Sequence, residues 1–271
     1  MRVALILAIA MSAACGTSSG PGSGAGTTAV ASEARVPIGN ATLFTREIGK
    51  GQPVVVLHGG PDFDSRYLVP DMDRLSDSFR LIYYDQRGRG RSAEGVRPED
   101  VTLESEMTDL DGVLKHFQLG SAVLLGHSWG TVLALEFALR HPDRVSHLIL
   151  MNPAPASKDD YLMFRKARQE QLGDQLDQMR AIAATEPFKS GDPDTVTAYY
   201  RIHFRAALDK PEDLDKILAS LRASFTKEGI LKARAVEDRL VNETWSSPKG
   251  YDLLPRLATL APPELSARTH E

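Results

Sequence analysis

The chain has 271 residues, of which 42% are hydrophobic and 25% charged, and its formal net charge is −4 at pH 7. This is the composition of an ordinary globular protein with room for one large domain, or for a domain that carries an insertion. The even mix of charges, without a basic stripe, argues against a nucleic-acid partner. No apolar run reaches the ~20 residues that span a bilayer.

The first residues predict an export signal over residues 1–14. Arg2 supplies a positive end, and Val3 to Met11 form an apolar segment too short for a membrane span. Small residues then lead to Cys15, the single cysteine, in a pattern that resembles a bacterial lipoprotein signal, although Ser12 stands where that family usually has an aliphatic residue. The resemblance implies a lipid on Cys15 that attaches the protein to a membrane of the cell envelope, on the periplasmic or extracellular face. The alternative is an ordinary cleaved signal with an incidental cysteine, and both alternatives imply an exported protein.

Residues 15–34 predict a flexible linker, because they are rich in Gly, Ser, Thr and Ala and lack periodicity. A folded core is expected over residues 35–155. Its expected elements are strands at 42–48, 53–57, 79–85, 121–125 and 145–151, and helices near 65–76 and at 104–117 and 131–140. Strands that alternate with helices predict a parallel sheet with helices on both faces, which is an α/β fold.

Residues 156–245 predict a helical lid, because no convincing strand occurs between 158 and 241. The amphipathic pattern there has two apolar stripes, made of Leu172, Leu176, Met179 and Ile182 and of Leu214, Ile217, Leu218 and Leu221. An all-helical insertion after an α/β segment is typical of a lid over the carboxyl ends of the strands, where open α/β sheets have their sites.

The most informative motif is Gly126-His127-Ser128-Trp129-Gly130. It fits G-x-S-x-G and lies between an apolar strand and a helix. This is the context in which a sharp turn pushes a serine hydroxyl out of the sheet edge. The glycines are expected because side chains at their positions would collide with the neighbouring strand and helix. The motif predicts Ser128 as a nucleophile.

Three motifs occur in a fixed order, each directly after an expected strand: His58-Gly59-Gly60-Pro61, Asp85-Gln86-Arg87-Gly88-x-Gly90-x-Ser92 and Gly126-x-Ser128-Trp129-Gly130. Together they resemble the proline iminopeptidase group of the α/β-hydrolase fold, over residues 37–260. The resemblance implies an α/β-hydrolase core with a helical lid and without cofactor or metal. It also implies an enzyme that releases the N-terminal residue of a small peptide, or cleaves a related amide or ester.

The resemblance assigns roles to single positions. Ser128 matches the nucleophile, and the backbone N–H groups of Gly60 and Trp129 match the oxyanion hole that receives the developing negative oxygen. Glu237 falls near one of the lid acids that hold the free amino group of the substrate. A second such acid has no match around residues 199–205, and Asp62 stands where the group usually has glycine.

Other polar residues of the motifs have a structural role in this comparison. His58 matches a structural position of the family, and His127 points away from the turn. Asp85, Arg87 and Arg91 resemble a loop that braces the pocket, and the alternative for them is a solvated charged turn.

The end of the chain departs from the family. In this fold an acid and a histidine follow the nucleophile in chain order, and both come after the lid. Residues 246–271 predict only a truncated return to the core, because 261–271 contain two adjacent prolines and a polar tail that cannot form a central strand. His270 is the one histidine after the lid. We therefore expect the last strands, the triad acid and its base to be missing, the strand at 145–151 to be an edge, and the chain to be a truncated or frameshifted homologue.

The sequence leaves three functions open. The first is a serine hydrolase that acts by acyl transfer through Ser128, with proline iminopeptidase-like release of an N-terminal residue. The second is a catalytically impaired homologue or a non-catalytic exported protein. The third is an esterase that uses the same serine without recognising an amine. Oligomeric state and substrate identity do not follow from the sequence.

Overall fold

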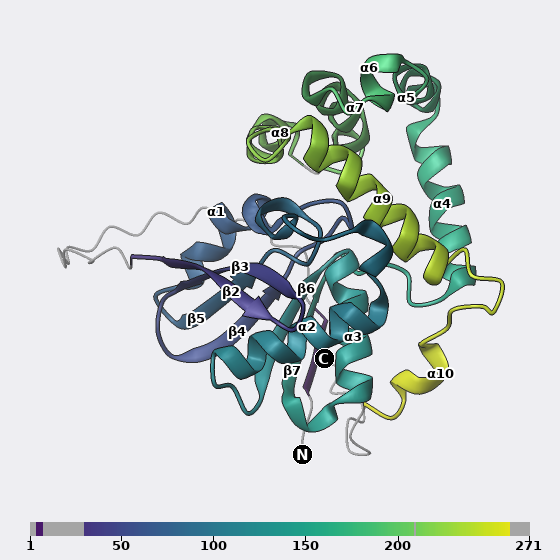
Figure 1. The fold of residues 1–271 in the computed structure, drawn as a ribbon. Coiled ribbons are helices and arrows are strands. Elements are labelled where there is room, and N and C mark those ends of the chain that lie inside the picture. The colour runs from purple at the N-terminus through teal and green to yellow at the C-terminus, as the bar shows by residue number, and fades with distance from the viewer. Residues whose placement is uncertain (1–3, 8–29, 209, 261–271) are drawn as a thin grey trace, which may run out of the picture.

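The computed structural model describes residues 4–7, 30–208 and 210–260 (Figure 1). Within these residues one seven-stranded sheet has the order β1-β7-β6-β4-β5-β3-β2. Its strands are β1 (Ala4–Leu7), β2 (Ser32–Ile38), β3 (Ala41–Ile48), β4 (Gln52–Leu57), β5 (Phe79–Tyr84), β6 (Ala122–His127) and β7 (Val145–Met151). β5, β4, β6, β7 and β1 are parallel, whereas β3 is antiparallel to β5 and β2 to β3. The expected parallel sheet is therefore mixed, with an antiparallel hairpin at one edge.

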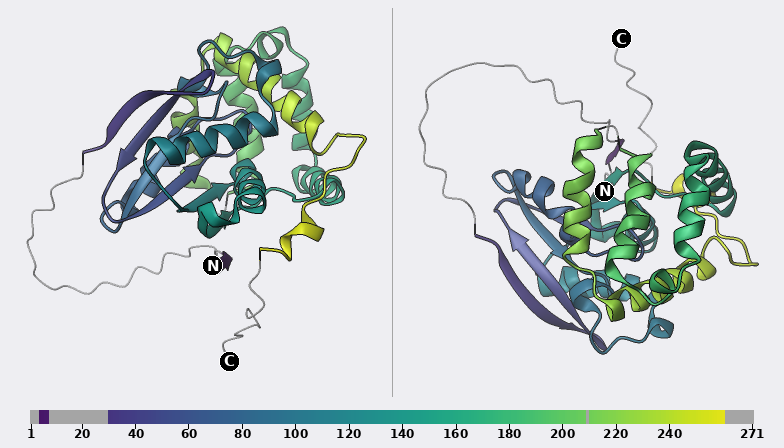
Figure 2. Two further views of the ribbon diagram at one scale, coloured as in Figure 1. Left: turned by 60° about the horizontal axis from the view of Figure 1, so that its bottom comes forward. Right: turned by 90° about the horizontal axis from the view of Figure 1, so that it is seen from above.

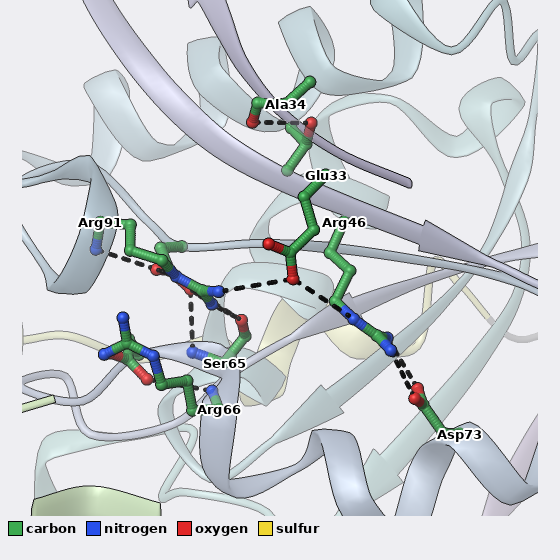
Figure 3. A network of polar contacts seen from close by, with 10 residues as sticks. Glu33, Ala34, Arg46, Ser65, Arg66, Asp73 and Arg91 are labelled. Atoms are coloured by element: carbon green, nitrogen blue, oxygen red, sulfur yellow. Dashed lines mark hydrogen bonds and ion pairs between the residues drawn. The ribbon is translucent and has the colours of Figure 1, made fainter. Parts of the chain in front are cut away.

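The start of β2 corrects the predicted linker, which was expected to extend to residue 34. Ser32 to Ala34 already pair with the end of β3. Charge holds this end of the hairpin in place, because the Glu33 carboxylate lies 3.7 Å from Arg46 and 4.0 Å from Arg91 (Figure 3). Ser32 to Ala34 belong to a strand because β3 pairs with them, and their own composition does not indicate this.

The edge of β7 also differs from the expectation. The strand at 145–151 was predicted to be an edge strand, but Ala4–Leu7 pair with His147–Leu150 in parallel register. The apolar segment that predicts an export signal supplies this strand, because a continuous apolar run suits a parallel strand. Cys15 and His270 lie outside the described residues.

Short helices and two long ones flank the sheet. The helix expected near 65–76 is broken into η1 (Ser65–Tyr67), α1 (Val69–Met72) and η2 (Asp73–Leu75). Pro70 has no N–H to donate to the preceding turn, which favours short turns over one helix. The long helices are α2 (Leu103–His116), which begins with a Thr102 capping box, and α3 (Trp129–Arg140).

The two faces of the sheet are covered unequally. Side chains alternate along β4, so Val55 and Leu57 pack with α2 and α3 on one face. Val54 and Val56 pack on the other face with the η1–α1 segment. The larger core therefore lies under α2 and α3, and α3 is the helix that begins directly after Ser128.

Six helices between residues 158 and 243 lie together at one end of the sheet (Figures 1 and 2). They are α4 (Lys158–Leu172), α5 (Gln175–Ala183), α6 (Glu186–Lys189), α7 (Pro193–Arg205), α8 (Leu214–Arg222) and α9 (Lys227–Glu243). The residues of the two apolar stripes that are buried are Leu172, Met179, Leu214, Leu218 and Leu221. After α9 the chain returns to the core at α10 (Leu254–Leu257). No helix in the described ranges is long and apolar enough to cross a membrane.

Candidate active site

Ser128 occupies a sharp turn between the end of β6 and the start of α3. Its backbone has φ 51° and ψ −119°, a left-handed conformation that residues other than glycine rarely adopt. A Cβ on Gly126 would lie 2.4 Å from the carbonyl oxygen of Gly130, and a Cβ on Gly130 would lie 2.1 Å from that of Leu57. These contacts explain why both positions are glycine. The turn therefore has the geometry that exposes a side chain at the carboxyl end of a central strand.

Two backbone N–H groups lie on the segments that border Ser128. Trp129 is the first residue of α3, so its N–H has no acceptor inside the helix. Gly60 lies in the loop after β4 with φ +123°, and a Cβ there would lie 2.2 Å from the backbone nitrogen of Asp62. The neighbouring Gly59 approaches Ser128 closely, since its Cβ would lie 2.9 Å from that of the serine. The structure thus brings together the three positions assigned to the nucleophile and the oxyanion hole.

His58 orients the peptide that carries the Gly60 N–H. The backbone N–H of Gln86 donates to His58 Nε2 at 3.0 Å, which leaves the hydrogen on Nδ1 to donate to the Gly59 carbonyl at 2.8 Å. In a trans peptide the Gly60 N–H points opposite to that carbonyl, so fixing one fixes the other. Burial lowers the pKa of His58 to about 4, so the ring stays neutral at pH 7.

The loop after β5 is a buried network rather than a solvated charged turn. Asp85 accepts hydrogen bonds from Ser65 Oγ at 2.7 Å and from Arg91 Nε at 2.8 Å. Burial alone would raise the pKa of Asp85, but the hydrogen bonds and charge of Arg91 hold it below its usual value. Asp85 therefore joins the loop to η1 as a carboxylate.

Two buried ion pairs attach the same loop to α2. Arg87 donates two hydrogen bonds of 2.6 Å to Asp109. Arg89 donates at 2.6 Å to Glu106, and neither side chain of this second pair is exposed. Arg89 also donates to the Gln86 side chain, whose amide in turn donates to the His58 carbonyl at 2.8 Å. A chain of contacts thus connects α2 to the loop of Gly60.

A pair of carboxyl groups lies where the lid meets the Gly60 loop. Asp62 accepts a hydrogen bond from the Tyr200 hydroxyl of α7. Burial raises the pKa of Asp62 and of Glu237 on α9, and the Asp62 charge raises the pKa of Glu237 further. Arg234 on α9 opposes both shifts. Glu237 is therefore half-buried and not a fully solvated surface residue.

The sequence did not indicate that Asp62 lies close enough to Glu237 to raise its pKa. The resemblance placed a second acid on the lid around residues 199–205, where no match was found, whereas Asp62 belongs to the core. The signal was present as the departure from glycine after His58-Gly59-Gly60-Pro61. Its meaning depended on the approach of α9, which no local pattern encodes.

A cavity of about 470 Å³ adjoins the Asp62 loop. It is lined by residues 62–64, 66, 90, 91, 93 and 94 of the core and, on the lid, by Val196, Tyr200 and residues between 223 and 234. Ser128 is not among its lining residues. The cavity therefore lies between the lid and the core, and not over the serine itself.

Trp129 joins the turn to the lid. Its indole meets that of Trp245, which follows α9, edge to face at 5.5 Å between ring centroids. Tyr161 of α4 stacks on the other side of Trp245 at 4.5 Å, and Trp245 Nε1 donates to the Pro155 carbonyl at 3.0 Å. Both connections between lid and core therefore meet beside Ser128.

The described residues place no proton acceptor beside Ser128. Among the described residues, no imidazole or carboxylate forms a hydrogen bond with its hydroxyl. His203 lies on α7 with its pKa lowered to about 4 by burial. No group of three His, Cys, Asp or Glu within the described ranges is arranged to hold a metal ion.

Comparisons with known proteins place this geometry in a family. A family model for the alpha/beta hydrolase fold matches residues 52–251. Epoxide hydrolase 3 of Xenopus tropicalis is 38% identical over 113 residues, or 41% of this chain and 30% of that protein. A proline iminopeptidase of Arabidopsis thaliana is 35% identical over 113 residues, or 40% of this chain and 29% of that protein.

The matched part of the chain thus spans about a third of the length of these curated relatives. The solved proline iminopeptidase of Mycobacterium smegmatis shares the fold with a TM-score of 0.54 and 23% identity, over 85% of this chain and 79% of that one. Because the family model covers more than half of the chain, the protein belongs to the α/β-hydrolase fold family.

Proposed function

We propose that this protein is a serine hydrolase that transfers acyl groups through Ser128. The observation that carries the proposal is the left-handed turn at Ser128 with the N–H groups of Gly60 and Trp129 beside it. In the reaction, Ser128 Oγ forms a bond to a carbonyl carbon and the carbonyl oxygen becomes negative. The two N–H groups stabilise that oxygen, and each such donor typically contributes about 2.7–4 kcal/mol to lowering the barrier. The leaving amine or alcohol departs, and water then hydrolyses the acyl-serine.

The proton of Ser128 must pass to a base, and the described residues place none beside the hydroxyl. A serine hydrolase without its base retains the effect of the oxyanion hole and of binding, about 10³–10⁴ over water. We expect a rate of that order from the described residues alone. This is also why a catalytically impaired homologue remains the alternative function.

The preferred substrate carries a free ammonium group. Partial burial raises the pKa of both Asp62 and Glu237, and the negative charge of Asp62 raises the pKa of Glu237 further. A cation bound between them offsets these shifts and lets both carry charge. This supports release of an N-terminal residue from a peptide over hydrolysis of a simple ester by an esterase, which needs no such pair.

The hydroxyl also argues against epoxide substrates, although an epoxide hydrolase is among the relatives. Attack of a serine on an epoxide would leave an alkyl ether on Ser128. Water cleaves an ester readily but not an ether, so the enzyme would not turn over. A carbonyl substrate gives an ester instead.

A fluorophosphonate probe tests the reactivity of Ser128, because it forms a covalent bond to a nucleophilic serine hydroxyl. Since the described residues place no base beside Ser128, we expect slow labelling of the purified chain and none of S128A. Absence of labelling in the unaltered chain, under conditions where it is folded, would refute the hydrolase and leave the non-catalytic alternative.

Paired substrates test the amine subsite. We expect proline naphthylamide to be cleaved with a KM that rises in D62N and in E237Q, because each variant removes one carboxylate from the pair. A nitrophenyl ester without an amine should keep its KM in both variants. Equal effects on the two substrates would contradict amine recognition and favour the esterase.

We also infer that the protein is exported and lipidated on Cys15, and this rests on the sequence of the first residues alone. Metabolic labelling with a fatty acid analogue should mark the chain and should fail for C15A. Retention of the label in C15A would refute the lipid site.

A further inference from the structure

Tyr67 of η1 connects the two segments that carry the oxyanion-hole amides. Its hydroxyl oxygen accepts a hydrogen bond from the Gly59 N–H at 2.7 Å, and it lies 2.7 Å from Nδ1 of His127. Gly59 precedes Gly60 in the loop after β4, and His127 precedes Ser128 in the turn after β6. One phenol group therefore touches both sides of the site.

The hydrogen positions follow from the partners. The Tyr67 oxygen already accepts from Gly59, so its own hydrogen is free to be donated. Burial lowers the pKa of His127 to about 4, so the imidazole is neutral and one ring nitrogen can accept. The arrangement that uses every group has Tyr67 donating to Nδ1 and the His127 hydrogen on Nε2.

The two segments approach each other so closely at Gly59 that a side chain at this position would not fit. A Cβ on Gly59 would lie 2.9 Å from the Ser128 Cβ, 2.9 Å from the Tyr67 hydroxyl and 3.0 Å from His127 Nδ1. Loop, turn and phenol thus meet around a single glycine. The two hydrogen bonds of Tyr67 join the loop to the turn beyond the last β4–β6 pair, Leu57 with Gly126.

We propose that Tyr67 is a positioning residue that fixes the distance between the Gly60 and Trp129 amides and so sets the size of the oxyanion hole. We call the two hydrogen bonds of Tyr67 the clamp. Its kinetic consequence rests on the proposed acyl transfer, whereas the clamp itself is a property of the fold. His58 holds the carbonyl of Gly59, whereas Tyr67 holds its N–H and relates it to the other segment. The two residues therefore have separate tasks.

A purely space-filling role for Tyr67 is separable from this one. Its ring packs edge to face with Phe63 and with His127, at 6.0 and 5.4 Å between centroids. Phenylalanine keeps those ring contacts and loses only the hydroxyl. Tyr84 offers a matched control, because its hydroxyl is buried without a hydrogen-bond partner in the described structure.

Amide hydrogen exchange of the full chain tests the clamp without needing activity. The Ser128 N–H donates to the Met151 carbonyl at 3.0 Å, a bond that Y67F does not alter directly. We expect Y67F to speed exchange at Gly59 and also at Ser128 by roughly tenfold, and Y84F to change neither. Faster exchange at Gly59 alone would overturn the proposal, because the hydroxyl would then serve only the loop.

Kinetics test the consequence of the clamp. We expect Y67F to slow acylation by a fluorophosphonate, and kcat for an ester, by roughly tenfold to a hundredfold, because a small misplacement of catalytic groups has such effects. KM should stay within about twofold, and Y84F should match the unaltered chain. An unchanged kcat in Y67F would overturn the proposal. If the unaltered chain does not react at all, the proposed function fails, while the exchange experiment still decides on the clamp.

Discussion

Replacing Glu106 by glutamine is expected to destabilise the protein strongly. The Arg89–Glu106 pair has a 2.6 Å contact and neither side chain is exposed, so E106Q leaves a buried guanidinium without its counter-charge. Breaking a buried pair in this way costs about 3–5 kcal/mol. Arg89 keeps the Arg87 carbonyl and the Gln86 side chain as acceptors, which places the expected loss near the lower end, at about 3 kcal/mol. In a domain of this size that corresponds to a fall in Tm of about 6–12 °C.

Urea unfolding followed by circular dichroism measures the loss. The exposed pair of Arg97 and Asp100, with 68% and 40% of the two side chains accessible, supplies the control. D100N should leave the midpoint of urea unfolding almost unchanged, because exposed pairs contribute little. The double variant R89M/E106L should recover much of the loss, since apolar replacements of a buried pair are often neutral. If E106Q were as stable as D100N, the reasoning about the buried pair would be wrong.

Three further results are expected. The raised pKa of Glu237 means that the folded protein holds this proton more firmly than the unfolded chain, so the stability it contributes at low pH is lost as pH rises through the folded-state pKa. E237Q should therefore be more stable than the unaltered chain at pH 8 but not at pH 4, and an equal difference at both pH values in urea unfolding would contradict the shift. G130A should fail to give folded, soluble protein, because its Cβ would meet backbone at 2.1 Å, whereas G120A, with no atom within 4 Å of its Cβ, should express normally. L5P should lower the Tm of the chain that retains residues 1–14, because proline is disfavoured inside a paired strand such as β1, and an unchanged Tm would show that β1 adds no stability.

Local patterns predicted the part of the site that local geometry builds. Gly126, Ser128 and Gly130 could be read from the sequence because the turn, the strand before it and the helix after it are contiguous. The same is true of the loop of Gly60, whose conformation needs glycine. The α/β-hydrolase fold followed from these motifs and is confirmed by the family model.

Contacts between distant segments were not predictable in the same way. Asp62 was visible as a departure from the family pattern, but its pairing with Glu237 depends on how α9 crosses the core. Tyr67 belongs to none of the three sequence motifs. Its hydroxyl contacts Gly59 and His127 only because η1 folds against them. Ser32 is part of β2 because it pairs with β3, and this pairing could not be predicted from the residues around Ser32.

The indole stack at Trp129, Trp245 and Tyr161 has a consequence for how such an enzyme could evolve. Trp129, whose amide is proposed to bind the carbonyl oxygen of the substrate, also packs against Trp245 at one end of the lid, and Trp245 stacks on Tyr161 at the other end. A movement of the lid that displaced Trp245 would therefore push on Trp129 and shift its backbone amide. Changes selected for a new substrate size would then alter the speed of bond breaking as well, so selectivity and turnover could not be adjusted independently.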